Sequence, residues 1–317
     1  MASTVAVKPP RERVADWPRI DRFGYYLCWA AGMTLCLIAA LIVGYMTIKG
    51  IQFLRPSLLW TRPQSSLDQK TSGGFLDPLL GTLMLTVIGV VIAGVVGVAI
   101  SVWLTEYGRP SWLGRAVESA IEVVAGTPSI VLAIFGLLLF QSGALGFVSF
   151  TAQGGGVFGR SFIAAGTMMS LLALPLVVGA TREALASIPR HVREASYALG
   201  KTRAATIWRV LLPAARPGIA TGLALGMGRI AGDTAIVVLL LGASGQINPV
   251  DEAFGPFKVL RGTGSTLTSY VYNNSPAGEG NNNEKAYAAA VVLLLIVIGL
   301  NFGVGLIRRG GGVQWTR

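Results

Sequence analysis

Two ionisable residues in the fifth of six long apolar runs are the clearest candidates for chemistry. Arg229 and Asp233 lie four residues apart in the segment Gly226-Met-Gly-Arg-Ile-Ala-Gly-Asp-Thr234. A charged group in hydrocarbon costs on the order of 3 kcal/mol, so such groups are usually paired or face a polar cavity. The guanidinium of Arg229 presents a planar fork of donors that suits an oxyanion, and the neighbouring glycines would let a ligand approach the backbone. We therefore predict a substrate path lined by Arg229, Asp233 and Thr234.

A mutual ion pair is the alternative interpretation of the same residues. Positions four apart share one face of a helix, so Arg229 and Asp233 could neutralise each other. Such a buried pair would fix packing and would have no contact with a substrate.

A polar insert between the fourth and fifth apolar runs has the pattern of a docking surface. Over residues 189–213, apolar side chains recur at helical spacing with arginines between them. Gly200 interrupts the pattern, and we expect Pro213 to end it before the next run. Two short helices joined at a glycine would form a compact knob that inserts into a groove of a partner, with Glu194 fixing the register. The alternative is a basic amphipathic loop that lies on anionic lipid.

The composition indicates that these candidates belong to an integral membrane protein. Of 317 residues, 52% are hydrophobic and 13% are charged, and the mean hydropathy is +0.61. The 41 glycines are typical of helices that pack backbone to backbone in lipid. Cys28 and Cys36 lie in one apolar run, about 12 Å apart at a rise of ~1.5 Å per residue, which favours neither a disulfide nor a metal site.

Six apolar runs are long enough to cross a bilayer, which needs about 20 residues of helix. They are residues 25–48, 79–105, 121–140, 162–180, 218–241 and 286–307. Backbone groups in hydrocarbon must pair internally, so we expect each run to be helical in spite of Pro128 and Pro175. The predicted fold class is an all-α, polytopic membrane protein with six transmembrane helices.

The distribution of Lys and Arg predicts the orientation of this protein in the membrane. With the N-terminus inside, most of the positive charges fall in cytoplasmic segments, above all in the loop 181–216. Both termini are then cytoplasmic, as tails at 1–24 and 310–317, and the first tail lacks the cleavage pattern of a signal peptide. This topology accounts for most of the net charge of +11, so we expect no nucleic-acid partner.

The insert and the fifth run together resemble a known family. Glu194-Ala195-Ser196, Gly200, Val210 and Leu212-Pro213 resemble the EAA loop of ABC-importer permeases, which has Ala and Ile where Ser196 and Val210 stand. Arg229-x-x-Gly-Asp-Thr234 resembles the Arg-x-x-Gly-Glu-Thr motif of phosphate-importer permeases, with Asp233 in place of Glu. The segments Gly126-Thr-Pro-Ser-Ile130 and Tyr272-Asn-Asn-Ser-Pro276 agree, and the likeness over residues 78–309 fits the A-type subunit better than the C-type.

The resemblance implies a fold, a substrate and a set of partners. The fold would be that of a type I ABC-importer permease, with a permease domain at 25–309 and a cytoplasmic coupling loop at 189–213. The chain would import inorganic phosphate by alternating access, beside a second permease subunit in membrane lipid. Two ATP-binding subunits would dock on Glu194, Ala195, Ser196 and Gly200, and an extracytoplasmic phosphate-binding protein would deliver the substrate.

The resemblance also implies what the chain itself does not do. ATP would be hydrolysed in the partners, so the chain would be no enzyme and would need no cofactor or metal, and it would lie in a bacterial or archaeal plasma membrane. A permease for another oxyanion, sulfate or molybdate, is one alternative. An ion-coupled secondary transporter is another, although the inverted halves and broken helices typical of that class are not evident in the sequence.

Overall fold

The computed structural model describes most of the chain outside its two ends. The described residues are 17–63, 73–108, 111–149, 159–242, 247, 258–276, 278 and 282–309. The predicted tail at 310–317 and residues 1–16 of the predicted tail at 1–24 lie outside these ranges. Within the first tail, the chain becomes helical at Arg19.

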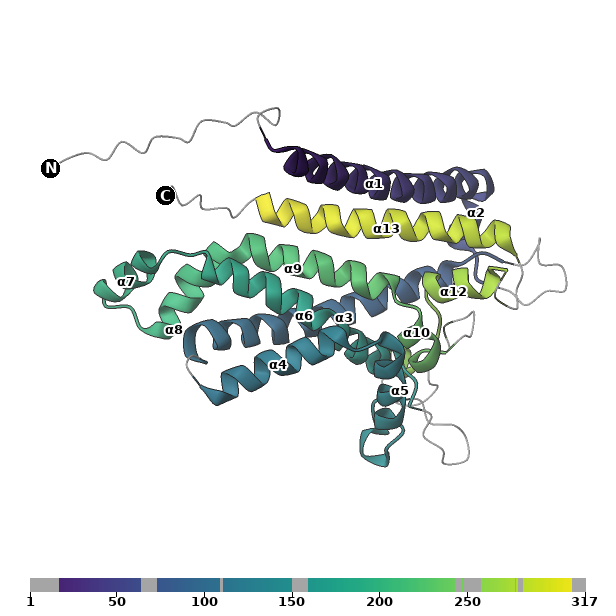
Figure 1. Ribbon diagram of the computed structural model, residues 1–317. Helices are drawn as coiled ribbons and strands as arrows, with labels where there is room; N and C mark the ends of the chain where they lie inside the picture. Colours follow the sequence, from purple (N-terminus) through teal and green to yellow (C-terminus); the bar gives the residue numbers. More distant parts are fainter. Residues whose placement is uncertain are drawn as a thin grey trace. The chain divides into compact units, whose positions relative to one another are not determined.

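The regular structure of the described residues is helical, which confirms the predicted fold class (Figure 1). The long helices are α1 (Arg19–Phe53), α3 (Leu76–Val102), α4 (Trp112–Gly126), α5 (Ser129–Phe140), α6 (Phe162–Ala186), α9 (Leu212–Gly232) and α13 (Asn283–Arg309). The short helices are α2 (Ser57–Trp60), α7 (Arg190–Ala198), α8 (Arg203–Thr206), α10 (Ala235–Leu240), α11 (Lys258–Arg261) and α12 (Leu267–Asn274). The π-helical turns are η2 (Trp103–Tyr107) and η4 (Ile207–Leu211), and η3 (Gly143–Leu145) is a 3-10 turn.

The chain divides into two compact units within α1, between Lys49 and Gly50. In the first unit, apolar side chains such as Met33, Leu37 and Leu41 are exposed along α1. A helix that is apolar on all sides is not suited to water and needs lipid or protein around it. This part of α1 therefore has the character of a membrane span.

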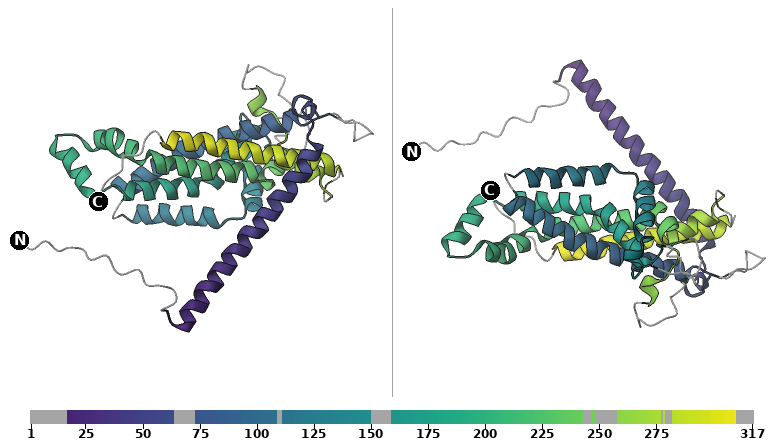
Figure 2. Two further views of the ribbon diagram at one scale, coloured as in Figure 1. Left: turned by 90° about the horizontal axis from the view of Figure 1, so that it is seen from above. Right: turned by 90° about the horizontal axis from the view of Figure 1, so that it is seen from below.

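The second unit is a bundle in which α6 packs against both α3 and α9, and α13 packs against α9 (Figures 1 and 2). Phe162, Met169 and Ala173 of α6 are fully buried, and they belong to the largest apolar cluster of the described residues. Short helices lie at the two ends of the bundle, α7 and α8 at one end and α10 and α12 at the other (Figure 1). We refer to the end that carries α7 and α8 as the α7 end.

Small residues allow α6 and α9 to approach each other closely, as the glycine content predicts. A Cβ added at Gly222 would lie only 3.1 Å from the Cβ of Ala180, and one added at Gly218 would overlap the Cβ of Ala184. Helices in lipid lack a hydrophobic force between them and gain stability from such close van der Waals contact. The position of α9 on α6 therefore depends on glycine at these two sites.

Five helical segments of the described residues are long and apolar enough to cross a membrane. They are Arg19–Phe53, Leu76–Tyr107, Phe162–Ala186, Arg203–Gly232 and Asn283–Leu306. The sixth candidate consists of α4 and α5, which together pass the same test but are bent by 108° at their junction (Figure 1). The prediction of one continuous helix over 121–140 is therefore wrong.

Pro128 explains the break between α4 and α5. It has no N–H to donate, and its ring pushes the preceding residue out of the helical region. Thr127 accordingly is extended, with φ of −76° and ψ of 128°, and α5 begins at Ser129. Pro175, in contrast, lies inside α6 without ending it, as predicted. Neighbouring helices surround α6 and support its backbone at this point.

Candidate functional site

The predicted docking knob consists of two short helices joined at Gly200, as the sequence pattern indicates (Figure 1). Gly200 has a φ of +74°, in the left-handed region. Its N–H donates to the Tyr197 carbonyl at 2.9 Å, and the Lys201 N–H donates to the Ser196 carbonyl at 3.2 Å. These two bonds form a Schellman ending, in which glycine avoids the strain that a Cβ would introduce.

The predicted docking residues face in two directions. Glu194, Ala195 and Gly200 are exposed on the surface of the chain. Ser196 is only 5% exposed, and its Oγ shares a hydrogen bond of 2.8 Å with Oγ1 of the buried Thr206. Ser196 thus ties α7 to α8 from within, while its three neighbours form the outer surface of the knob.

The prediction that Pro213 ends the insert is wrong, because α8, η4 and α9 form one helical segment from Arg203 to Gly232. The π-helical turn η4 ends at Leu211, two residues before Pro213. Such a turn widens the backbone where the proline ring would otherwise press against the carbonyl of Arg209. α8 is therefore continuous with a helix that is long and apolar enough to cross a membrane.

The fifth apolar run, predicted to be helical over 218–241, is interrupted at Asp233 and Thr234. α9 ends at Gly232, and Asp233 is extended, with φ of −80° and ψ of 137°. A short second helix, α10, then begins at Ala235. Asp competes for backbone donors with its own side chain and so favours helix ends over helix interiors, which is consistent with the position of this break.

The side chain of Asp233 holds the start of α10. Its carboxylate is buried, and Oδ1 accepts the Ile236 N–H at 3.0 Å. Its backbone carbonyl accepts the hydroxyl of Thr268, in α12, at 3.2 Å. Because the backbone is extended, Asp233 does not share a helical face with Arg229, and among the described residues no ion pair joins them. The mutual ion pair that the spacing allows is therefore not formed.

Arg229 lies on an exposed stripe of α9, together with Thr221 and Leu225. No hydrogen bond or ion pair within the described ranges engages its guanidinium. The glycines at 228 and 232 leave open space beside it, since a Cβ added at either would meet no atom within 4 Å. A cation in this position is available to a ligand or to a second protein.

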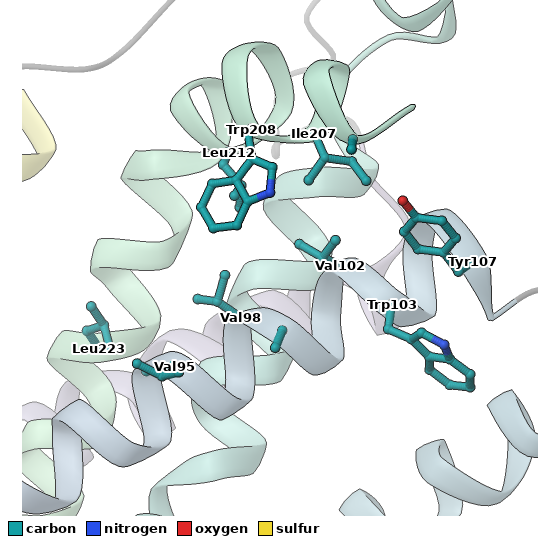
Figure 3. Close-up of a pocket in the computed structure, with 12 residues that line it drawn as sticks. Val95, Val98, Val102, Trp103, Tyr107, Ile207, Trp208, Leu212 and Leu223 are labelled. Atoms are coloured by element: carbon teal, nitrogen blue, oxygen red, sulfur yellow. The ribbon is translucent and has the colours of Figure 1, made fainter. Parts of the chain in front are cut away.

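An apolar groove lies elsewhere, between α3 and the segment formed by α8, η4 and α9 (Figure 3). It has a volume of about 600 Å³ and is walled mainly by valines of α3 and by Trp208 and Leu212. No carboxylate, lysine or arginine lines it, so it is unsuited to an oxyanion. In the described part of the chain, no group of three or more His, Cys, Asp and Glu residues could hold a metal ion.

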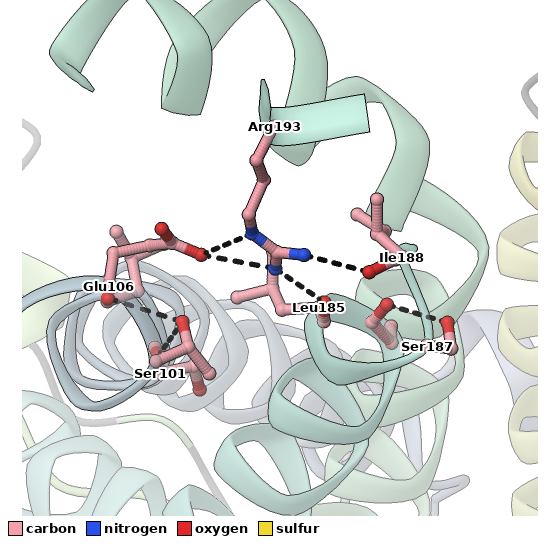
Figure 4. Close-up of polar contacts among 9 residues, drawn as sticks. Ser101, Glu106, Leu185, Ser187, Ile188 and Arg193 are labelled. Atoms are coloured by element: carbon pink, nitrogen blue, oxygen red, sulfur yellow. Dashed lines mark hydrogen bonds and ion pairs between the residues drawn. The ribbon is translucent and has the colours of Figure 1, made fainter. Parts of the chain in front are cut away.

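Two further residues at the α7 end form a polar contact that the sequence reasoning missed. Arg193 of α7 makes an ion pair with Glu106, which lies in η2 at the end of α3 (Figure 4). The sequence shows only an acidic residue directly after an apolar run and one arginine among many in a distant loop. Nothing in their spacing indicates that the two residues meet.

The packed helices, their apolar spans and the exposed knob define a membrane-embedded component of the ABC-importer permease fold. Residues 97–310 match the family described as the inner membrane component of binding-protein-dependent transport systems, and the chain belongs to this family. A bacterial ABC transporter involved in alginate import has the same fold, with a TM-score of 0.58 at 16% identity over 91% of this chain and 97% of that one.

Curated relatives share more of the sequence than the solved structures do. The phosphate transport system permease protein PstA 1 of Mycobacterium tuberculosis is 37% identical over 190 residues, which are 60% of this chain and 58% of that protein. The phosphate transport system permease protein PstC of Xylella fastidiosa is 29% identical over 249 residues, 73% of this chain and 75% of that protein. The chain thus spans somewhat more than half the length of the first of these relatives.

Proposed function

We propose that the chain is a permease subunit of an ATP-driven importer of inorganic phosphate, most similar to the A-type subunit. It would convert the closure of partner ATPases into alternating access by rigid-body motion of its helices. The observation that carries the proposal is the exposed guanidinium of Arg229, which lies on a membrane-crossing helix without a partner in the described part of the chain. The names of the relatives supply the substrate class.

A cation on a membrane-crossing helix needs a compensating group, because hydrocarbon does not solvate it. In the proposed assembly, Arg229 faces the path between this chain and a second permease subunit, where it pairs with the passing anion. Arginine suits this role because its planar fork donates two parallel hydrogen bonds to phosphate. The open space beside the glycines at 228 and 232 allows the substrate to reach it.

Asp233 and Thr234 complete the proposed path at the junction of α9 and α10. Asp233 fixes the junction through Ile236, and its negative charge favours hydrogen phosphate, which carries an O–H, over sulfate, which carries none at neutral pH. Thr234 is half-buried beside it and offers a hydroxyl. The site would therefore prefer phosphate to sulfate because hydrogen phosphate carries a proton that the Asp233 carboxylate can accept in a hydrogen bond.

The knob formed by α7 and α8 is the proposed docking surface for the ATP-binding subunits. Glu194, Ala195 and Gly200 lie on its outer surface, and Leu199, which is 78% exposed, is an apolar anchor beside them. Helix-in-groove contacts combine such anchors with a charged residue that sets the register. Ser196 acts from inside, where its bond to Thr206 keeps the two short helices together.

The remaining parts of the proposal concern orientation and assembly. The excess of Lys and Arg supports an orientation in which the knob and both termini lie in the cytoplasm of a bacterial or archaeal cell. One ATP-binding subunit would dock on this chain and a second on the partner permease subunit. A phosphate-binding protein would dock at the opposite end of the bundle. ATP hydrolysis would take place in the partners alone.

The test is ATP-dependent uptake of labelled phosphate by membrane vesicles that contain the whole transporter. Arg229→Lys keeps the charge but loses the fork, and we expect it to reduce uptake strongly, whereas Arg216→Lys on the same helix serves as the matched control. Asp233→Asn should narrow the preference for phosphate over sulfate. Full phosphate uptake by Arg229→Lys would contradict the proposed path. Better uptake of sulfate or molybdate than of phosphate by the unaltered protein would show that phosphate is not the substrate. Phosphate uptake driven by an ion gradient without ATP would show that the protein is an ion-coupled secondary transporter and not part of an ATP-driven importer.

A further inference from the structure

Arg193 makes a set of contacts inside the α7 end that is separate from the exposed docking residues. Its Nε and Nη2 lie 3.2 and 3.1 Å from Oε1 of Glu106 (Figure 4). Its Nη1 donates to the carbonyl of Ile188 at 2.7 Å, and Nη2 donates to the carbonyl of Leu185 at 2.9 Å. A single side chain of α7 therefore engages the end of α3 and the end of α6 at the same time.

These contacts are largely shielded from water. The Glu106 side chain is 6% exposed and that of Arg193 is 19% exposed. Screening by salt and water weakens exposed ion pairs, but a buried pair with hydrogen bonds resists separation, because breaking it leaves a charge without solvation. The contact therefore behaves as a stiff connection.

The connection reaches a part of the bundle that the chain itself does not join to α7. Along the sequence, α7 continues directly from α6 and leads through α8 into α9. It has no such link to α3, and Arg193 and Glu106 are 87 positions apart. Of the ion pairs seen among the described residues, the one between Arg193 and Glu106 joins α7 to a different helix.

Close to Glu106, α3 is also held to α6. The Oγ of Ser101 is buried, and its single hydrogen is shared between the carbonyl of Gly97, in α3, at 2.7 Å and the carbonyl of Val178, in α6, at 3.2 Å. A force applied at Glu106 would therefore move the ends of α3 and α6 as one body. Interfaces that move as rigid bodies transmit small displacements without losing them to local deformation.

We propose that Arg193 is a positioning residue for energy coupling: it carries the displacement of α7 into α3 and α6 through Glu106. This role rests on the proposed docking of an ATPase on the knob. It is distinct from docking, because Arg193 points away from the outer surface that holds Glu194 and Ala195. Loss of the contact removes the link between α7 and the end of α3 and leaves the docking surface in place, while Arg203 of α8 stays over the Tyr107 ring, 4.7 Å from its centroid.

The experiment compares the amount of phosphate taken up per ATP hydrolysed by the reconstituted transporter. The variants are Arg193→Ala, Glu106→Gln and the double variant, and Arg193→Lys keeps the charge with fewer donors. The matched control is Glu118→Gln, which removes an ion pair of 2.7 Å between α4 and α6 that does not involve α7. Recovery of the ATPase subunits with the complex, the rate of ATP hydrolysis and the thermal unfolding of the purified complex are measured in parallel.

We expect both single variants to retain the ATPase subunits and to hydrolyse ATP, with a fall of about fivefold or more in phosphate per ATP, the lower end of typical coupling between sites. The double variant should be no worse than the worse single variant, since both remove the same contact. Arg193→Lys should be intermediate, and Glu118→Gln should match the unaltered protein.

Three results would overturn the proposal. They are an unchanged ratio in the single variants, losses that multiply in the double variant, and loss of the ATPase subunits from Arg193→Lys, which would make the arginine part of the docking surface. If the unaltered protein retains no ATPase at all, the docking proposal fails instead. If Arg193→Ala or Glu106→Gln unfolds, the amount of phosphate taken up per ATP by Arg193→Lys decides whether the proposal holds.

Discussion

Replacing Gly200 with alanine isolates the backbone contribution to the shape of the knob. Gly200 has a φ of +74°, and a Cβ added there would meet no atom within 4 Å. The added methyl group therefore collides with nothing, and the effect comes from the left-handed backbone alone. That conformation costs an L-residue with a Cβ roughly 1–2 kcal/mol. The Schellman ending of α7 should be destabilised by this amount.

Hydrogen exchange measures this change at the bonds concerned. The amides of Gly200 and Lys201 donate the two bonds that close α7, so they exchange when the ending opens. A loss of 1–2 kcal/mol corresponds to a rise of about 5-fold to 30-fold in the open population. Gly200→Asn is the matched control, because asparagine tolerates the left-handed region better than alanine does. Equal exchange rates in Gly200, Gly200→Asn and Gly200→Ala proteins would refute the reasoning.

Two further predictions concern the bundle. Gly218→Ala should destabilise the packing of α6 against α9 by roughly 1–3 kcal/mol, because its Cβ would overlap that of Ala184. Gly179→Ala is the control, because a Cβ at this position of α6 would meet no atom within 4 Å. Similar thermal unfolding of the two variants in detergent would argue against the close approach of α6 and α9. Burial raises the pKa of Tyr270 to about 12 from its usual 10, so the folded protein favours the neutral phenol. Its contribution to stability should be complete below about pH 10 and be lost as pH rises to about 12. Tyr270→Phe should flatten this part of the alkaline unfolding profile, and an unchanged slope would contradict the assignment.

The lengths of the apolar runs predicted most of the membrane-crossing helices correctly. The runs at 25–48, 79–105 and 162–180 each lie within a helix that is long enough to cross a bilayer, and the run at 286–307 lies within α13, which is also long enough. This agreement has a physical cause, since bilayer thickness and the need to pair backbone groups constrain length and composition directly. The run at 121–140 failed because composition does not reveal whether neighbouring helices support the backbone around a proline. Pro128 breaks a helix, and Pro175 does not.

Of the two polar candidate sites, the knob could be predicted from the sequence, and the arrangement of Arg229 and Asp233 could not. The knob and its glycine could be predicted because helical spacing and a helix-ending glycine are local signals. The relation between Arg229 and Asp233 could not, because spacing of four residues implies one helical face only if the helix continues. Asp233 instead accepts the Ile236 N–H and holds α10, a choice that depends on α10 and α12 packing beside it.

The sequence by itself determined the class of this protein, most of its helical spans and the existence of the knob, because hydropathy, run length and glycine position are properties of short stretches of chain. Only the tertiary structure decided where the spans break, which docking residues are buried, and that Arg193 meets Glu106. These features depend on contacts between residues far apart in the chain, such as the 87 positions that separate that pair. Such contacts are set by how whole helices pack, and no local pattern encodes them.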